Sequence, residues 1–286
     1  MIIAVASGKG GTGKTTISTN LAFSLKTNVQ FLDCDVEEPN AHIFINPEIK
    51  KTEDVSIPVP VVDREQCVFC GKCQEVCAYN AIAVFSPKEK TKGKILVFPE
   101  LCHGCGACAY LCPQKCIKEV HRVVGVLESG TKGDIDFVHG KLNIGEAMAP
   151  PVIRAVKDKI DQKKTIIIDA PPGTSCPVIS SLQGSDFCLL VTEPTPFGLN
   201  DLVLAVEVSR KMRIPFGVVI NRADLGDSKT EKYCEEENIP ILMRIPFKKE
   251  IAAAYSKGVS IVEEFPEYRK EFQELFKKIE KIVRGL

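Results

Sequence analysis

The chain has 286 residues, enough for one large domain or two ordinary ones, and its hydrophobic content of 44% is enough for a buried core. Lysine plus arginine and aspartate plus glutamate number 37 each, so the formal net charge is zero and gives no support for binding to nucleic acid or to an anionic membrane. The longest apolar runs fall short of the roughly 20 residues that a membrane helix needs. No signal peptide precedes the first predicted strand, so we expect a cytoplasmic protein.

The first part of the chain predicts the opening of a parallel sheet. A short buried strand is expected over residues 2–6, followed by a glycine-rich loop over residues 7–16. A helix over about residues 14–25 and a second strand over residues 29–33 come next. Strand, loop, helix and strand in this order are typical of an α/β protein.

The middle of the chain, residues 57–122, is rich in cysteine and has few apolar repeats of helical length. Beyond it the α/β pattern resumes. Strands are expected over residues 122–128, 136–142, 165–169, 187–192, 216–220 and 241–245, and helices over residues 151–162, 198–211, 228–238 and 267–283. Because the two flanking parts complete only one sheet, we predict a mostly parallel α/β domain of residues 1–56 and 123–286, with a small α+β domain inserted between them.

Eight of the 13 cysteines form two sets with the same spacing, C-x2-C-x2-C-x3-C. The first set is Cys67, Cys70, Cys73 and Cys77, and the second is Cys102, Cys105, Cys108 and Cys112. The flanking residues repeat as well, since Ala81-Ile82 corresponds to Cys116-Ile117, which indicates two half-domains related by an approximate twofold axis. In a reducing compartment such cysteines indicate metal ligation rather than disulfides.

The spacing resembles that of bacterial two-cluster ferredoxins, in which the fourth cysteine of each set binds the other cluster. The resemblance implies one [4Fe–4S] cluster on Cys67, Cys70, Cys73 and Cys112, and another on Cys102, Cys105, Cys108 and Cys77. Zinc is the alternative, although zinc ribbons usually have separated C-x2-C pairs. One departure is Ala78, which follows Cys77 where a proline is usual.

Five cysteines lie outside these sets: Cys34, Cys116, Cys176, Cys188 and Cys234. We expect them to be small buried residues rather than ligands. Cys116 corresponds to Ala81 in the repeat, which favours a packing role. Cys34 and Cys176 lie beside nucleotide-binding motifs, and the sequence leaves their roles open.

The loop after the first strand fits the phosphate-binding pattern G-x4-G-K-[ST]. It comprises Gly8, Lys9, Gly10, Gly11, Thr12, Gly13, Lys14 and Thr15, and Thr16 follows. Glycines let successive backbone N–H groups bind phosphate oxygens at a helix N-terminus. Lys14 is predicted to reach the β- and γ-phosphates of ATP, and the Thr15 hydroxyl to bind Mg²⁺.

With Lys9 the loop reads K-G-G-T-G-K-T-T, which resembles the deviant Walker A loop of the MinD/ParA/Mrp ATPases and the nitrogenase iron protein. The resemblance implies that Lys9 reaches a partner's nucleotide across an ATP-dependent homodimer. It also implies that Asp35 positions the attacking water and that Asp33 and Asp169 act on Mg²⁺ through its water shell. Asn221 is expected to contact adenine.

Three functions remain open at this point. The first is an ATPase that couples a nucleotide-dependent dimer switch to electron transfer through two clusters, toward a redox partner that the sequence does not name. The alternative is an ATP-dependent assembly or carrier protein for iron–sulfur or other metal cofactors, similar to the Mrp type, whose C-x2-C pair in the ATPase domain has no counterpart here. A positioning ATPase on DNA or membrane is disfavoured by the zero charge, and we expect the amphipathic C-terminal helix to pack on the sheet.

Overall fold

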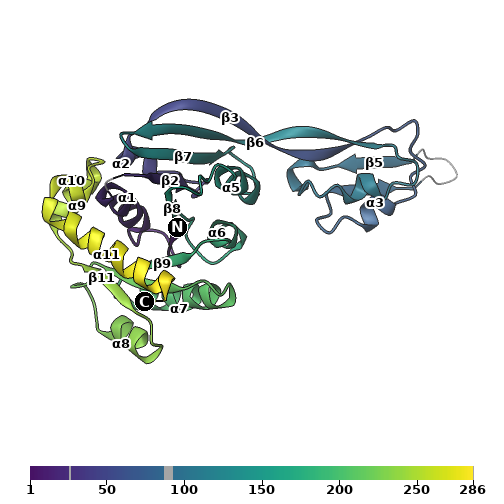
Figure 1. Cartoon of the computed structure of the whole chain (residues 1–286). Helices are drawn as coiled ribbons and strands as arrows, with labels where there is room; N and C mark the ends of the chain where they lie inside the picture. Colours follow the sequence, from purple (N-terminus) through teal and green to yellow (C-terminus); the bar gives the residue numbers. More distant parts are fainter. Residues whose placement is uncertain (26, 87–92, 286) are drawn as a thin grey trace. The chain divides into compact units, whose positions relative to one another are not determined.

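The computed structural model describes residues 1–25, 27–86 and 93–285, which form two compact units. The larger unit comprises Met1–Glu53, Leu127–Lys141 and Val152–Leu286, and the smaller unit comprises Asp54–Val126 and Leu142–Pro151. The boundaries fall within strands β3 (Glu48–Val62) and β6 (Ile117–Lys132), so each of these strands contributes residues to both units (Figure 1). The predicted insertion of residues 57–122 lies within the smaller unit.

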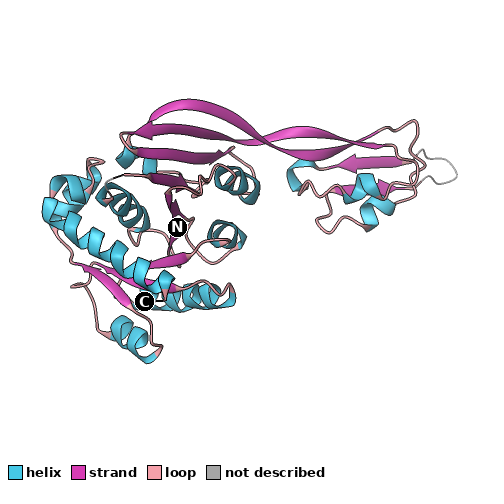
Figure 2. Cartoon of the chain, in the orientation of Figure 1, coloured by secondary structure: helices cyan, strands magenta, loops and turns pink. Residues whose placement is uncertain are grey.

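Within the described ranges, nine strands form one sheet in the order β11-β10-β9-β1-β8-β2-β7-β6-β3 (Figure 2). The other strands of this sheet are β1 (Ile2–Ala6), β2 (Val29–Asp33), β7 (Ile135–Leu142), β8 (Thr165–Asp169), β9 (Phe187–Thr192), β10 (Phe216–Asn221) and β11 (Ile241–Ile245). From β11 to β7 all neighbouring strands are parallel. The predicted fold class, α/β with a mostly parallel sheet, is therefore confirmed.

Helices cover both faces of this sheet, with α1 and α11 on one face and α6 and α7 on the other (Figure 1). The helices of the larger unit are α1 (Lys14–Ser24), α2 (Ala41–Ile45), α5 (Pro150–Lys157, whose first residues belong to the smaller unit), α6 (Cys176–Leu182), α7 (Pro196–Lys211), α8 (Lys229–Glu236), α9 (Lys249–Ser256), α10 (Ile261–Glu264) and α11 (Pro266–Arg284). Within these ranges, as in the rest of the described chain, no helix has both the length and the apolar character needed to cross a membrane.

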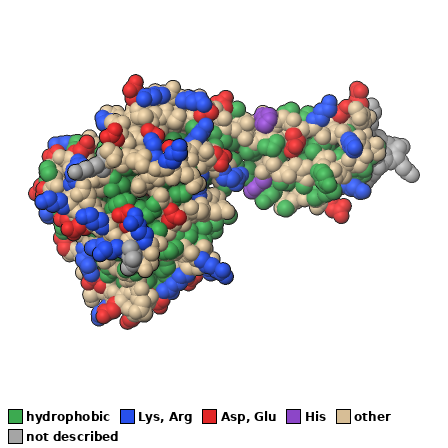
Figure 3. Space-filling model, viewed as in Figure 1, with side chains coloured by type: hydrophobic (Ala, Val, Ile, Leu, Met, Phe, Trp, Pro, Cys, Tyr) green, Lys and Arg blue, Asp and Glu red, His purple; other side chains and the backbone are tan. Residues whose placement is uncertain are grey.

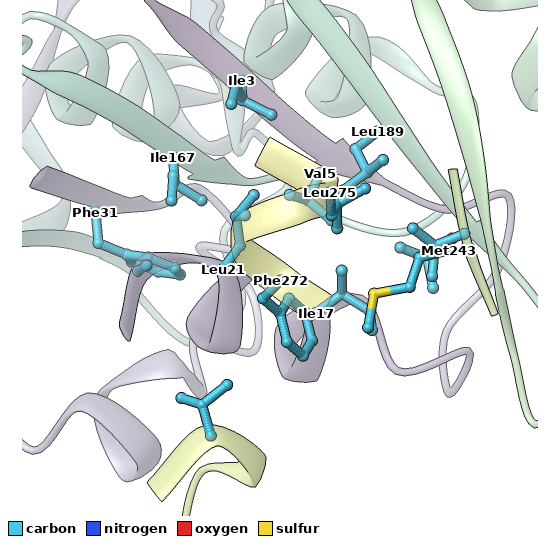
Figure 4. Close-up of a cluster of buried hydrophobic side chains, with 14 of the residues drawn as sticks. Ile3, Val5, Ile17, Leu21, Phe31, Ile167, Leu189, Met243, Phe272 and Leu275 are labelled. Carbon is cyan, nitrogen blue, oxygen red and sulfur yellow. The ribbon is translucent and has the colours of Figure 1, made fainter. Parts of the chain in front are cut away.

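The main core follows from the alternation of side chains along the strands. Ile3 and Val5 point to the same face of β1 and are fully buried against α1 and α11 (Figure 4). From α11, Phe272 and Leu275 enter the same cluster. The expectation that the C-terminal helix packs on the sheet is confirmed. On the face shown in Figure 3, basic and acidic side chains are interspersed over the larger unit, in keeping with the zero formal charge.

The smaller unit is built from short elements around a core of its own. Besides β3 and β6 it contains the antiparallel pair β4 (Ile82–Phe85) and β5 (Lys94–Val97), the short helices α3 (Lys72–Glu75) and α4 (Ala107–Tyr110), and a 3₁₀ turn, Pro99–Leu101. Ile82, Ile95 and Ile117 form its core together with cysteine side chains. Strand β3 was not predicted. Pro58 and Pro60 interrupt its apolar alternation, and prolines are tolerated there because β3 is an edge strand.

Candidate functional site

The carboxyl ends of β1, β2, β8 and β10 meet at one edge of the sheet, because these strands are parallel. A cavity of ≈ 420 Å³ lies at this edge, within the roughly 300–1,000 Å³ range of small-molecule sites. Of the predicted nucleotide-site residues, those that line it are Gly10, Gly11, Gly13, Lys14, Thr15, Thr16, Asp35 and Asn221. The lining does not include Gly8, Lys9, Thr12, Asp33 or Asp169.

The loop conformation depends on two glycines with different neighbours. Gly13 has φ +89°, and a Cβ at this position would lie 2.4 Å from Asn221 Nδ2. The same Nδ2 donates a hydrogen bond of 2.8 Å to the Thr12 carbonyl, so Asn221 fixes the loop. A Cβ at Gly8 would lie 2.2 Å from the carbonyl oxygen of Asp201, in the second turn of α7. Glycine is needed at both places for lack of space.

Lys14 is held by acidic residues behind the loop. Its Nζ donates to Asp169 Oδ1 at 2.9 Å and lies 3.5 Å from Asp35 Oδ2. Burial alone would lower the pKa of Lys14, but the Asp169 and Asp35 carboxylates outweigh burial and raise the pKa above its ordinary value. The Thr15 hydroxyl donates to Asp169 Oδ2 at 2.6 Å, so the two groups predicted to act on Mg²⁺ are direct neighbours.

Asp33 does not line the cavity, but its side chain holds the turn that places Asp35 in the cavity lining. Its Oδ1 accepts the backbone N–H of Asp35 at 3.0 Å, and its Oδ2 accepts that of Ala41 at 3.0 Å. Burial raises the pKa of Asp33 to about 8 and that of Asp35 to about 6. This geometry makes Asp33 a positioning residue for Asp35, and its place in the Mg²⁺ water shell stays a prediction.

Two buried polar atoms at this edge have no partner in the described part of the chain: Thr12 Oγ1 and Asn40 Oδ1. A buried polar atom without a hydrogen bond costs roughly 1–3 kcal/mol. Asn40 also lines the cavity. Together with the buried Lys14–Thr15–Asp169 group, these atoms fit a ligand that brings phosphate oxygens and a magnesium ion.

Several cavity residues were missed from the sequence. Asn40 lies between β2 and α2, and Pro246 and Phe247 follow β11, whose carboxyl end reaches the same edge. The signal was available for Phe247, because it follows a predicted parallel strand. Arg222, which was noted beside Asn221 in the sequence and so was not missed, lines the cavity too and donates to Glu193 Oε1 at 2.7 Å.

The eight clustered cysteines of the smaller unit line two cavities. The first cavity is lined by Cys67, Cys70, Cys73 and Cys112, and the second cavity by Cys77, Cys102, Cys105 and Cys108. The fourth cysteine of each set therefore lies with the first three of the other set. This is the grouping that the resemblance to two-cluster ferredoxins implied; that these cysteines bind iron stays a prediction.

The backbone around both cavities suits thiolate ligands. Gly71 (φ +81°) and Gly106 (φ +73°) precede α3 and α4 in left-handed conformations that glycine adopts easily. The N–H of Gly104 donates to Cys102 Sγ at 3.4 Å, and the N–H of Ala81 to Cys77 Sγ at 3.3 Å. Such bonds stabilise sulfur ligands. Over the described residues, no group of three or more His, Cys, Asp or Glu side chains could hold a single metal ion.

Four soft sulfur donors at each cavity, and in the second cavity two N–H groups directed at sulfur, fit a [4Fe–4S] cluster. Of the other five cysteines, Cys34, Cys188 and Cys234 are buried, as expected. Cys116 is buried too, but it lines the first cavity. Cys176 is exposed, so the expectation of a buried residue is wrong there, because the side chain lies at the first position of α6 and outside the core.

Residues 3–261 match the family model described as CobQ/CobB/MinD/ParA nucleotide binding domain. The chain belongs to this family. Family membership confirms the prediction, made from the loop, of a MinD/ParA-type nucleotide-binding fold. An uncharacterized protein of Methanocaldococcus jannaschii is 30% identical, over 99% of this chain and 98% of its own length.

Two further comparisons give a relative and a solved structure to which this chain is similar. The iron-sulfur cluster carrier protein of Pyrococcus horikoshii is 25% identical, over 97% of this chain and 84% of its own length. Among solved structures, the septum site-determining protein MinD of the same organism, complexed with Mg-ADP, has a TM-score of 0.57 at 20% identity, covering 99% of this chain and 96% of the other. At that identity the likeness shows the fold alone.

Proposed function

We propose that this chain is an ATPase that carries iron–sulfur clusters and releases them under the control of its nucleotide. The observation that carries the proposal is the presence of two cavities, each lined by four cysteines, on a chain that also has the buried Lys14–Thr15–Asp169 group of a nucleotide site. Five relatives named iron-sulfur cluster carrier protein support it. They are 24–27% identical over 91–99% of this chain.

The exposure of the cysteines supports release. Cys70 and Cys105, which are equivalent positions of the repeat, are exposed, whereas Cys73 and Cys102 are buried. Each cavity thus has one thiol that an acceptor's thiolate can approach and others that retain the cargo. A bound [4Fe–4S] cluster would supply exchangeable iron–thiolate bonds at these exposed positions.

With ATP and magnesium bound, Lys14 would hold the phosphates, and Thr15 and Asp169 would hold the magnesium ion. Asp35 lines the cavity and, when ionised, can accept a proton from the attacking water. Lys9, which is outside the cavity lining, is proposed to act on the nucleotide of a second copy, so that ATP binding and dimerisation depend on each other. Light scattering should then show an ATP-dependent dimer for Asp35→Asn, which retains ATP, and a monomer for Lys9→Ala.

A chain of contacts within the larger unit connects the nucleotide site with strand β6. Asp33 pairs in register with His139 of β7, and His139 Nε2 lies 2.7 Å from Glu128 Oε2 on β6. Strand β6 continues to Ile117, next to Cys116. We propose that movement of the Asp33–Asp35 turn acts on the cysteine-bearing unit through β6. Replacement of Glu128 by Gln should leave the rate of ATP hydrolysis unchanged and should reduce the effect of ATP on cluster release.

The test uses the full chain, loaded anaerobically with iron and sulfide, and a small apo-ferredoxin as acceptor. ATP should speed the movement of iron to the acceptor severalfold, and Asp35→Asn should abolish this acceleration. Asp134→Asn, an exposed residue of the turn between β6 and β7, is the matched control and should behave as wild type. If all iron stayed on the chain with and without ATP, the carrier function would be refuted.

Electron transfer is the second candidate, and the grouping of the cysteines favours it. Because each set gives its fourth cysteine to the other cavity, two clusters bound there would lie within one small unit, as in ferredoxins that pass electrons. The same loaded protein separates the two functions. Retention of all iron, together with an ATP-dependent rate of electron transfer to a reducible dye, would select electron transfer.

A further inference from the structure

The two cysteine-lined cavities differ at one position of the repeat. Ala81 lines the second cavity, and its counterpart Cys116 lines the first. The first cavity therefore contains five cysteines and the second contains four. We propose that Cys116 is a reserve fourth ligand of the first cavity, able to take the place of Cys112. This inference rests on the proposed binding of clusters by the two cysteine sets.

The two turns that carry these residues have the same backbone. The N–H of Asn80 donates to the Cys77 carbonyl at 3.2 Å, and the N–H of Lys115 donates to the Cys112 carbonyl at 3.1 Å. Asn80 and Lys115, the residues before Ala81 and Cys116, both have a left-handed backbone conformation, with φ +53° and +51°. Ala81 and Cys116 thus occupy equivalent places, and the thiol is the one chemical difference between their side chains.

The Cys116 thiol is held close to the ligand that it would replace. Its Sγ lies 3.5 Å from Cys112 Sγ. The side chain is only 4% exposed and packs beside Cys73, Ile95 and Ile117. Its carbonyl accepts the N–H of Asp63 at 2.8 Å, which fixes the backbone. The thiol therefore lies at the cavity, within 3.5 Å of the sulfur that it would replace.

The exchange is balanced in atoms and charge. Cys116 gives up its thiol proton and forms a bond to the iron that Cys112 held. Cys112 leaves this iron and takes up the proton, for which the 3.5 Å contact between the sulfurs is a direct path. One iron–sulfur bond forms and one breaks, and no electron is transferred. The first cavity keeps four thiolates when Cys112 is lost, whereas the second cavity has no such substitute for Cys77.

The test compares equivalent losses in the two cavities of the full chain, loaded anaerobically. Cys112→Ala should retain about eight irons per chain and the [4Fe–4S] spectrum of the wild type. Cys77→Ala should lose about one to four irons, with a [3Fe–4S] signal in electron paramagnetic resonance where one corner is lost. Cys116→Ala alone should keep about eight irons, and Cys112→Ala combined with Cys116→Ala should behave like Cys77→Ala.

A gain-of-function variant covers the case in which a loss variant fails to fold. Ala81→Cys in the Cys77→Ala background should restore about eight irons, because it places a thiol where Cys116 stands in the other half. Nucleotide binding by each variant reports that the larger unit is folded, and an iron count restored by Ala81→Cys reports that the smaller unit is folded. Equal iron loss in Cys112→Ala and Cys77→Ala, or no recovery with Ala81→Cys, overturns the role of Cys116. A wild-type chain that takes up no iron overturns the proposed function itself.

Discussion

Replacement of Asp169 by Asn tests whether the nucleotide-free site is held together by its buried ion pair. Asp169 is fully buried and accepts hydrogen bonds from Lys14 Nζ at 2.9 Å and Thr15 Oγ1 at 2.6 Å. Removing one member of a buried pair costs roughly 3–5 kcal/mol. Asp35 remains 3.5 Å from Lys14, and the amide oxygen of Asn can still accept a hydrogen bond. We therefore expect Asp169→Asn to lower the free energy of unfolding by about 3 kcal/mol, at the lower end of that range.

The assay is urea unfolding of the nucleotide-free protein, followed by circular dichroism. Asp136→Asn is the matched control, because Asp136 pairs with Lys164 at the surface, and such pairs contribute about 1 kcal/mol or less. ATP, added with a chelator that removes magnesium, should narrow the difference in free energy of unfolding between Asp169→Asn and wild type. The reason is that the phosphates bring negative charge to Lys14. If Asp169→Asn lowered the free energy of unfolding no more than Asp136→Asn, the buried ion pair would not hold the nucleotide-free site together.

Three further predictions concern the larger unit. ATP hydrolysis should fall as the pH drops through about 6, because burial raises the pKa of Asp35 to about 6 and only its ionised form can accept a proton; a profile flat down to pH 4.5 would contradict this. Gly13→Ala should weaken ATP binding at least tenfold in calorimetry, because its Cβ would lie 2.4 Å from Asn221 Nδ2, whereas Gly133→Ala, which has positive φ but open space, should not. Phe272→Ala should lower the free energy of unfolding by about 3–5 kcal/mol and the exposed Phe197→Ala by less than about 0.5 kcal/mol; equal effects would show that α11 does not hold the core.

Much of this architecture could be predicted from the sequence, because its signals are local. Residues 2–6 are a short apolar run that leads into the glycine-rich loop, and residues 165–169 are one that ends in Asp169. The structure has strands β1 and β8 with those bounds. The resemblance to two-cluster ferredoxins likewise implied which of the cysteines would lie together. Sequence repeats and the ends of predicted strands indicate where such residues lie, and they can be recognised without knowing how the core packs.

Long-range contacts account for what could not be predicted. Asn40 has no recognisable motif around it. It lines the cavity because of the turn that Asp33 fixes by accepting the N–H of Ala41. Cys116 corresponds to an alanine in the repeat and resembled a packing residue, yet its Sγ lies 3.5 Å from Cys112 Sγ in the first cavity. Strand β3 is an edge strand whose prolines obscure its alternation.

We propose that one chain holds two [4Fe–4S] clusters, each on three cysteines of one set and the fourth of the other. Mössbauer spectroscopy of the chain loaded with ⁵⁷Fe, combined with chemical analysis of iron and sulfide, measures whether both clusters are present. We expect about eight irons and eight sulfides per chain, with all iron in [4Fe–4S] form. Bound zinc in place of iron, or no more than about four irons in a folded, nucleotide-binding chain, would contradict it.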